Sequence, residues 1–144
     1  MTREEYKEMY NVVGAAMEVY NVLGRGMAEQ IYQEALQKEM SLRGMDAERE
    51  KVLTLQYKGQ TLDKTYKADM VYNGIIIELK SCEELCSDHQ AQLFNYMRIT
   101  QHTRGILFNF GEKNLHTERF LYIPEYDDFI LLNQDNYKDF IITS

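Results

Sequence analysis

A tight β-hairpin is expected at Asn73-Gly74, which separates two runs rich in β-branched and aromatic residues. A type I′ turn needs positive φ at both of its central residues, and asparagine and glycine tolerate that conformation best. The pattern therefore predicts two antiparallel strands, residues 61–72 and 75–80, joined by a two-residue loop. Because the loop is so short, counting outward from it fixes which side chains stand opposite each other.

Two carboxylates, Asp69 and Glu78, fall opposite each other in this register. Their Cβ atoms are then about 5 Å apart, and like charges in such a pair destabilise a sheet. Lys67 and Lys80 lie two residues away on the same face. Either a divalent cation binds between the carboxylates, or the lysines neutralise them on a surface hairpin. The apolar run 75–77 favours the cation, because it is typical of a buried strand, where a charge needs a partner.

The composition is that of one globular domain. The 144 residues are 44% hydrophobic and 27% charged, with one proline and eight glycines, and a chain of this length buries about two-thirds of its unfolded surface. No apolar run approaches the roughly 18 residues of a membrane-spanning helix, and no signal pattern opens the chain. Cys82 and Cys86 are too few for a zinc knuckle. We expect a cytoplasmic protein with reduced thiols and no membrane contact.

The formal charge of −7 disfavours a nucleic-acid partner, but the charge is unevenly distributed. Residues 1–50 and 125–144 each carry −4, whereas residues 51–124 carry +1. The acidic excess therefore lies outside the predicted hairpin, which leaves room for a basic groove beside it.

Hydrophobic periodicity predicts the remaining elements. Capping boxes are expected at Thr2 with Glu5 and at Ser87, where each would open a helix. The predicted helices span residues 3–22, 27–43 and 88–100, and the further strands span residues 52–57, 105–110 and 119–123. The inner face of the first helix includes Tyr10 and Met17, and that of the second includes Ile31, Ala35, Leu36 and Met40.

Strand, helix and strand follow one another over residues 75–110, which implies a parallel crossover pairing. We therefore expect an α/β (α+β) fold: a central mixed β-sheet with an antiparallel meander and one parallel crossover strand, flanked by helices. Residues 1–123 would form this domain. Residues 124–144 contain apolar runs such as 128–132 and would form a C-terminal extension that packs on the domain or on a partner.

Short motifs recur in a fixed order along the chain. One reads Gly26-Met27-Ala28-Glu29-Gln30-Ile31-Tyr32. The others are Val13-Gly14-Ala15-Ala16, Tyr66-Lys67-Ala68-Asp69, Ile77-Glu78-Leu79-Lys80, Gln92-Leu93-Phe94-Asn95-Tyr96 and Asn109-Phe110-Gly111. Together these stretches, within residues 10–123, resemble the PD-(D/E)XK nuclease superfamily and, more narrowly, the small bacterial proteins of the GxxExxY family. Tyr20 departs from that pattern, where the family has a histidine.

The resemblance implies a restriction-endonuclease-like core with a metal site. Asp69 and Glu78 would hold Mg²⁺ or Mn²⁺ together with the backbone carbonyl of Leu79. Glu29 would reach the same ion directly or through water. Lys80 would orient the attacking water and stabilise the charge that develops on the phosphate.

Gln92 and Tyr96 match the Q-xxx-Y signature of RecB-type nucleases within the superfamily. Gln92 would position the lysine or the substrate, and Tyr96 would contact the substrate backbone or buttress the site. From the residues alone, other interpretations stay open. Tyr96 could be a core residue, His89 a helix-surface residue, and Glu29 an acid that stabilises a helix N-terminus.

Hydrolysis of a phosphodiester needs an activated water, neutralised oxygens and a stabilised leaving group, which carboxylate-bound Mg²⁺ and a fixed lysine can supply. We expect a Mg²⁺- or Mn²⁺-dependent nuclease acting on nucleic acid, with DNA favoured over RNA. The alternative is a non-catalytic nuclease-fold module that binds or regulates, as a homodimer or within a DNA repair or defence assembly. Hydrolysis of a small phosphate ester is a third alternative.

Overall fold

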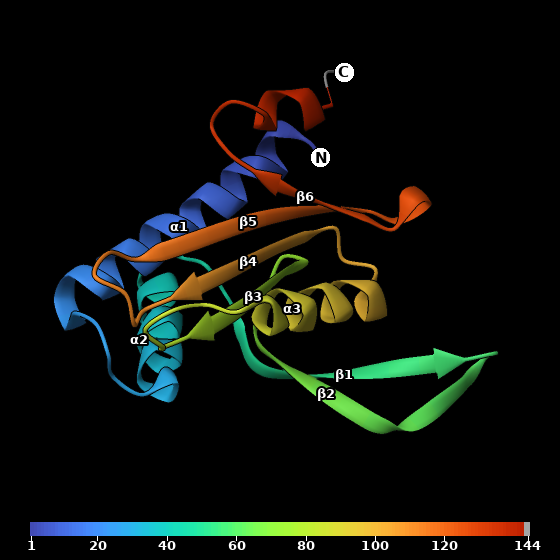
Figure 1. Cartoon of the computed structure of the whole chain (residues 1–144), viewed down its shortest axis with the longest axis horizontal. Coiled ribbons are helices and arrows are strands. Elements are labelled where there is room, and N and C mark those ends of the chain that lie inside the picture. Colours follow the sequence, from blue (N-terminus) through green and yellow to red (C-terminus); the bar gives the residue numbers. More distant parts are fainter. Residues whose placement is uncertain (143–144) are drawn as a thin grey trace.

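The computed structural model describes residues 1–142, which form three α-helices and a six-stranded sheet (Figure 1). The helices are α1 (Arg3–Leu23), α2 (Glu29–Leu42) and α3 (Ser87–Thr100). The strands are β1 (Glu48–Tyr57), β2 (Gln60–Tyr72), β3 (Ile75–Lys80), β4 (Arg104–Asn109), β5 (His116–Ile123) and β6 (Asp128–Leu132). Two short 3-10 helices, η1 (Pro124–Tyr126) and η2 (Tyr137–Phe140), follow β5 and β6.

The strands lie in the sheet in chain order, β1 to β6. The β3–β4 pair is parallel and is connected through α3, whereas the other four neighbouring pairs are antiparallel. This topology confirms the predicted mixed sheet with a meander and one crossover. No helix within residues 1–142 is long and apolar enough to cross a membrane.

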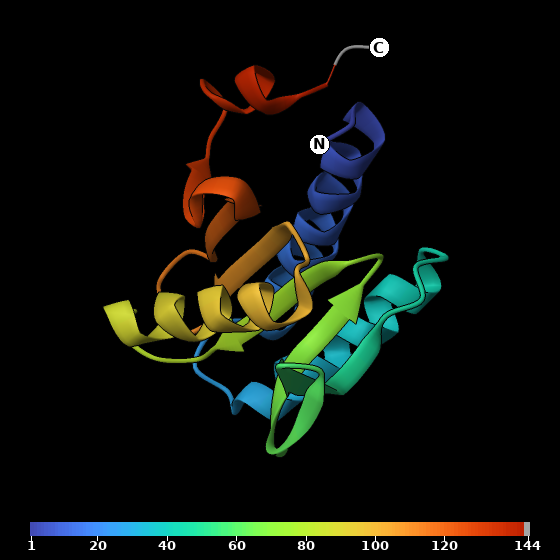
Figure 2. The same ribbon diagram turned by 90° about the vertical axis from the view of Figure 1, so that its right-hand side faces the viewer.

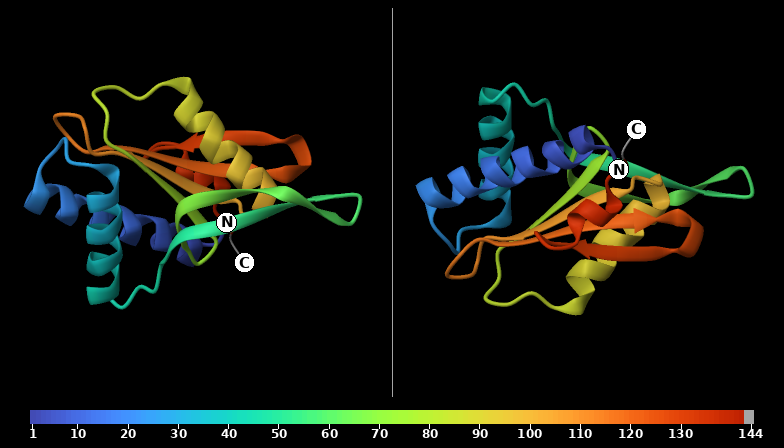
Figure 3. Two further views of the ribbon diagram at one scale, coloured as in Figure 1. Left: turned by 90° about the horizontal axis from the view of Figure 1, so that it is seen from below. Right: turned by 90° about the horizontal axis from the view of Figure 1, so that it is seen from above.

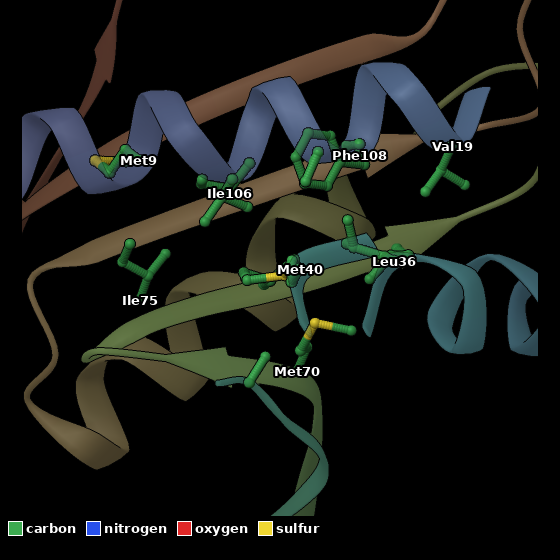
Figure 4. Packing of buried hydrophobic residues seen from close by; sticks show 14 of the residues in the cluster. Met9, Val19, Leu36, Met40, Met70, Ile75, Ile106 and Phe108 are labelled. Carbon is green, nitrogen blue, oxygen red and sulfur yellow. The ribbon is translucent and has the colours of Figure 1, made fainter. Parts of the chain in front are cut away.

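Helices cover both faces of the sheet (Figure 2). On one face, α1 and α2 pack on alternate strand residues, including Ile75 and Ile77 of β3 (Figure 4). On the other face, α3 packs on residues that include Ile76. Because side chains alternate along a strand, this pattern places Glu78 and Lys80 on the α3 face of β3, where the sheet core gives way to polar side chains.

The hairpin between β2 and β3 forms as predicted. Asn73 has φ 46° and Gly74 has φ 77°, as a type I′ turn requires. The register is also confirmed, with Tyr72 opposite Ile75 and the next two pairs following in step. The turn dipeptide therefore sets the alignment of the strands that carry Asp69 and Glu78.

The predicted buried faces of α1 and α2 were partly wrong. The capping box at Thr2 is present, but Tyr10 and Met17 of α1 are exposed. The buried face of α1 consists of smaller side chains and one methionine: Met9, Val12, Ala15, Ala16 and Val19. Small residues let the helix approach the sheet closely, so the larger ones flank the contact.

In α2, Ile31 is exposed, whereas Tyr32 and Gln33 are buried beside Leu36 and Met40. The helix begins at Glu29 rather than at residue 27, and the Tyr32 ring stacks on Phe110 with centroids 4.3 Å apart. The buried face therefore keeps Leu36 and Met40 as predicted, whereas Tyr32 and Gln33 are buried in place of Ile31. At α3 the N-cap is Cys86 rather than Ser87.

The C-terminal residues continue the sheet. β6 pairs antiparallel with β5, from Ile123–Asp128 to Arg119–Leu132. Beyond it, Tyr137 stacks on Tyr6 of α1, and the N-terminal ammonium of Met1 donates to the Phe140 carbonyl.

Candidate metal centre

Beyond the last backbone pair of β2 and β3, side-chain carboxylates accept the hydrogen bonds between the two strands. The β2–β3 pairs run from Tyr72–Ile75 to Met70–Ile77. One residue further, the Asp69 N–H donates to Glu78 Oε1 over 2.9 Å, and the Leu79 N–H donates to Asp69 Oδ2 over 2.8 Å. Each carboxylate therefore accepts a backbone hydrogen bond from the opposite strand, which brings the two acids together.

Asp69 of β2 lies opposite Glu50 of β1, between two paired positions. In the β1–β2 ladder, Arg49 pairs with Met70 and Lys51 pairs with Ala68, and the position between these two pairs is unpaired. Between these pairs Glu50 has φ 50°, a left-handed conformation that interrupts the strand. Asp69 therefore lies beside an irregular position of β1.

The pair is electrostatically strained. Glu78 is only 2% exposed. Burial raises the pKa of the Glu78 carboxyl well above its ordinary value, the Asp69 charge raises it further, and Lys80 opposes the shift. In the absence of a cation, a proton shared at Glu78 relieves the repulsion.

The donor set suits a hard divalent cation. Within residues 1–142, the hydrogen bonds to Glu78 reach Oε1, which leaves Oε2 for a ligand. The N–H and C=O of one strand residue point to the same edge of the strand. Since the Leu79 N–H faces Asp69, the Leu79 carbonyl faces that edge too. Carboxylate and carbonyl oxygens are the ligands that Mg²⁺ and Mn²⁺ prefer.

Gln33 is a site residue that sequence reasoning missed. Its side chain is 6% exposed, and Nε2 donates to Asp69 Oδ1 over 3.0 Å. Asp69 is therefore held from two directions, by α2 and by β3. The available signal was spacing, because Gln33 lies four residues after Glu29 and three before the buried Leu36.

Arg49 extends this network. One of its terminal nitrogens lies 3.5 Å from Gln33 Oε1. Among the described residues, Arg49 Nε is the buried side-chain nitrogen or oxygen that has no hydrogen-bond partner. A guanidinium that contacts Gln33, the partner of Asp69, thus retains donor capacity.

Glu29 lies at the start of α2 and is exposed. Within residues 1–142, no group of three or more acidic, cysteine or histidine side chains is close enough to hold a metal. The structure therefore unites Asp69 with Glu78 but does not bring Glu29 to them. Burial raises the pKa of the Cys82 thiol, and the charge of Glu29 adds to that effect, which places Glu29 near the segment that follows β3.

The α3 residues adjoin the pair. Gln92 Nε2 donates to the Tyr96 hydroxyl over 3.1 Å. Tyr96 is 4% exposed and packs in the α3 core. Burial raises the pKa of Tyr96, followed by the charges of Glu78 and then Asp69. Tyr96 therefore combines core packing with proximity to the site. His89 accepts from the Cys86 N–H at the start of α3.

The segment after Lys80 is fixed by Asn109, which is fully buried. Asn109 Oδ1 accepts from the N–H groups of Cys82 and Gly111, and Nδ2 donates to the Cys82 carbonyl and to Glu112. The Phe110 N–H also donates to the Lys80 carbonyl over 2.8 Å. These bonds join the loops that leave β3 and β4 and hold the backbone of Lys80 in place.

The close approach at Gly111 gives a stability prediction. A Cβ at this position would lie 2.2 to 2.6 Å from backbone atoms of Cys82, and backbone cannot yield as a flexible side chain does. We expect Gly111→Ala to lower the free energy of unfolding by about 3 kcal/mol. Urea denaturation followed by circular dichroism measures it. Gly59→Ala, which strains a turn but meets no neighbour within 4 Å, is the comparison, and an equal loss in both variants would contradict this account.

The buried pair also gives a pH prediction for metal-free protein. Because the pKa of Glu78 is higher in the folded state than in the unfolded state, the native protein binds more protons between the two values. The stabilisation that comes from protonating Glu78 is thus fully present below about pH 4.3, the ordinary pKa of a glutamate. It is lost as the pH rises through the pKa of Glu78 in the native protein. We expect Glu78→Gln to be less destabilised than wild type by a rise from pH 5 to pH 8 in EDTA. If the free energy of unfolding depended on pH in the same way in Glu78→Gln and in wild type, the raised pKa of Glu78 would be contradicted.

The sheet topology and the carboxylate pair on the β2–β3 hairpin define an α/β fold of the restriction-endonuclease-like class. The model of the PD-(D/E)XK nuclease superfamily matches residues 6–120. The chain therefore belongs to that superfamily, whose members generally use divalent metal ions.

Similarity in fold extends to SSO0001, known from its crystal structure, with a TM-score of 0.50 and 19% identity. The match covers 62% of this chain and 48% of that one, so the chain spans about half the length of SSO0001. At this identity the likeness concerns the fold alone. A search of curated proteins finds no match.

Proposed function

We propose that this protein is a Mg²⁺- or Mn²⁺-dependent nuclease that hydrolyses phosphodiester bonds of nucleic acid, with DNA favoured over RNA. The observation that carries the proposal is the position of the two carboxylates, since Glu78 accepts from the Asp69 N–H and Asp69 accepts from the Leu79 N–H. Two acids held together at the end of a ladder repel each other, and a cation relieves that repulsion. Superfamily membership supports the same assignment.

The ion would be held by Asp69, Glu78 and the Leu79 carbonyl. Glu29 would coordinate the same ion directly or through water. When bound, Mg²⁺ or Mn²⁺ supplies an activated water and neutralises charge on the phosphate. Glu29 is exposed at the start of α2, so water could link it to the ion.

Lys80 would orient the attacking water and stabilise negative charge on the phosphate. It lies on the α3 face with Glu78 and already influences the Glu78 carboxyl. Gln92 would position Lys80 or the substrate. Tyr96, held by Gln92, would contact the substrate backbone or buttress the carboxylates.

We assign the chain more narrowly to the GxxExxY family on the motif at residues 26–32. We further propose a nuclease-like domain over residues 1–123, a C-terminal extension over residues 124–144 and a homodimer. The free thiols of Cys82 and Cys86 suit the cytoplasmic location that we propose.

Incubation with labelled single- and double-stranded DNA and RNA tests the activity. We expect cleavage with Mn²⁺ or Mg²⁺, none in EDTA, and a rise in thermal stability with Mn²⁺ that Glu78→Ala abolishes. Purified protein that cleaves none of these substrates and whose Tm ignores Mn²⁺ would contradict the proposal.

A non-catalytic binding or regulatory module is the alternative. The observation that favours it is the separation of the exposed Glu29 from the buried pair. This alternative predicts binding of nucleic acid or a protein partner without metal-dependent stabilisation, so the Mn²⁺ thermal shift separates the two functions.

A further inference from the structure

The distal parts of β1 and β2 form a two-stranded ribbon whose base packs on α3 and whose tip extends beyond the helices. We define the β1–β2 ribbon as residues 51–67; it projects beyond the other elements in both views of Figure 3. Nearly all of its side chains are exposed, and Leu53 is the buried one at its base. A two-stranded ribbon gains little stability of its own in water, so such a projection is typical of a surface that meets a partner.

The ribbon is basic in an acidic protein. It carries four lysines, all exposed, and one acid, Asp63, so its net charge is +3 in a chain of net −7. The lysines are Lys51, Lys58, Lys64 and Lys67. A concentration of positive charge on one projecting element is the electrostatic footprint of a polyanion partner.

Aromatic side chains accompany the lysines. Lys58 Nζ lies 5.6 Å from the centroid of the Tyr57 ring, and Lys64 Nζ lies 5.6 Å from that of Tyr66. Tyr57 is 61% exposed. Each ring supports a cation and presents a hydroxyl, a combination suited to phosphate and sugar contacts.

The dimensions suit duplex DNA. Gly59 at the tip is ten residues from Asp69 along β2, or about 33 Å at roughly 3.3 Å per residue. One turn of B-DNA is about 34 Å long, and the major groove accepts a two-stranded β-ribbon. The β1–β2 register shifts between Thr54 and Gln56, and irregularities of the bulge type increase the twist of a ribbon, which helps it to follow a groove.

We propose that the β1–β2 ribbon lies in the major groove of duplex DNA and holds it across the Asp69–Glu78 site. The proposal rests on the proposed function for the position of the scissile phosphate. The ribbon lysines contact phosphates up to one helical turn from that position, and the site residues contact the phosphate that is cleaved. Arg49 of β1 precedes the ribbon, with a terminal nitrogen 3.5 Å from Gln33 Oε1 and an unpartnered Nε.

Val52, Leu55 and Leu62 are also exposed on the ribbon. These apolar side chains would suit contact with a protein partner or with a second copy of this chain. The excess of lysine over acid on the ribbon favours DNA as the partner.

Binding in EDTA tests the ribbon without requiring cleavage. The probe is a labelled 30-bp duplex, with dissociation constants measured by fluorescence anisotropy between 50 and 200 mM salt. Lys58→Gln/Lys64→Gln is compared with Lys7→Gln/Lys38→Gln, which removes two exposed lysines from α1 and α2. All four positions are solvent-exposed, so both variants should fold.

Loss of two phosphate contacts should weaken duplex binding about tenfold or more at 100 mM salt and reduce the slope of log K against log salt by about 2. The α1/α2 variant should stay within about threefold of wild type. Wild type should also lose affinity when the duplex is shortened below about 10 bp, one helical turn, whereas the ribbon variant should respond less.

Equal affinity in the ribbon variant and the wild type would overturn the proposal. So would wild-type protein that binds no duplex at 50 mM salt. A ribbon variant that binds DNA normally but changes from dimer to monomer in sedimentation would assign the ribbon to a protein interface instead. Because EDTA prevents metal-dependent chemistry, ribbon-dependent binding without any cleavage in Mn²⁺ would overturn the nuclease proposal and leave the ribbon contact standing.

Discussion

Asp69→Asn is expected to lower Mn²⁺-dependent cleavage on the order of 10³-fold, because a loss of about 4 kcal/mol in transition-state stabilisation corresponds to that factor. The substitution keeps the shape of the side chain but removes its charge and one acceptor oxygen. In the native site both oxygens accept, one from Gln33 and one from Leu79. An asparagine must turn its amide donor toward one of these two donors, so the carboxylate geometry and the ion are lost together.

The same variant should lose the rise in Tm that Mn²⁺ produces in wild type. Without metal, the lost hydrogen bond costs about 1–3 kcal/mol, and relief of the repulsion with Glu78 offsets part of that loss. Asp63→Asn, on the exposed ribbon, is the matched control and should keep the Mn²⁺ response. Cleavage by Asp69→Asn within tenfold of wild type, at equal folded fraction, would remove Asp69 from the site.

Lys80→Gln is expected to reduce kcat about 100-fold while the Mn²⁺-induced rise in Tm persists. The reason is its position, since Lys80 lies on the α3 face beside Glu78 and contributes positive charge there without serving as a ligand. Single-turnover cleavage and thermal denaturation with Mn²⁺ separate the two effects.

The charge of Lys80 also lowers the pKa of Glu78. Lys80→Gln should therefore shift the pH dependence of Mn²⁺ binding upward, because Glu78 must lose its proton before it can act as a ligand. Lys38→Gln on α2 provides a charge-matched control. If Lys80→Gln abolished the Mn²⁺ response altogether, Lys80 would be needed to assemble the site rather than to act on the substrate.

Local chemistry made the hairpin predictable. Asn73-Gly74 has one favoured turn type, and the two-residue loop left one register, so Asp69 and Glu78 were placed near each other from sequence alone. The backbone pairing nevertheless stops one residue earlier than the count suggested, at Met70–Ile77. The two acids then contact the opposite backbone, which a pattern of residue types does not encode.

Tertiary placement was the part that sequence did not determine. Gln33 reaches Asp69 from a helix whose buried stripe depends on the stacking of Tyr32 on Phe110, nearly 80 residues away in the chain. The distance of Glu29 from the pair likewise depends on how the loop after α1 packs. The apolar run at 128–132 was recognised, but its pairing with β5 requires a sheet edge that periodicity cannot locate.

The most direct test of the metal centre is an anomalous difference map from a crystal soaked in Mn²⁺. We expect a peak about 2.1 Å from Asp69, Glu78 Oε2 and the Leu79 carbonyl, the distance at which oxygen ligands bind a Mg²⁺-like ion. No peak between the two carboxylates at saturating Mn²⁺, with the Asp69–Leu79 and Glu78–Asp69 hydrogen bonds intact, would contradict it.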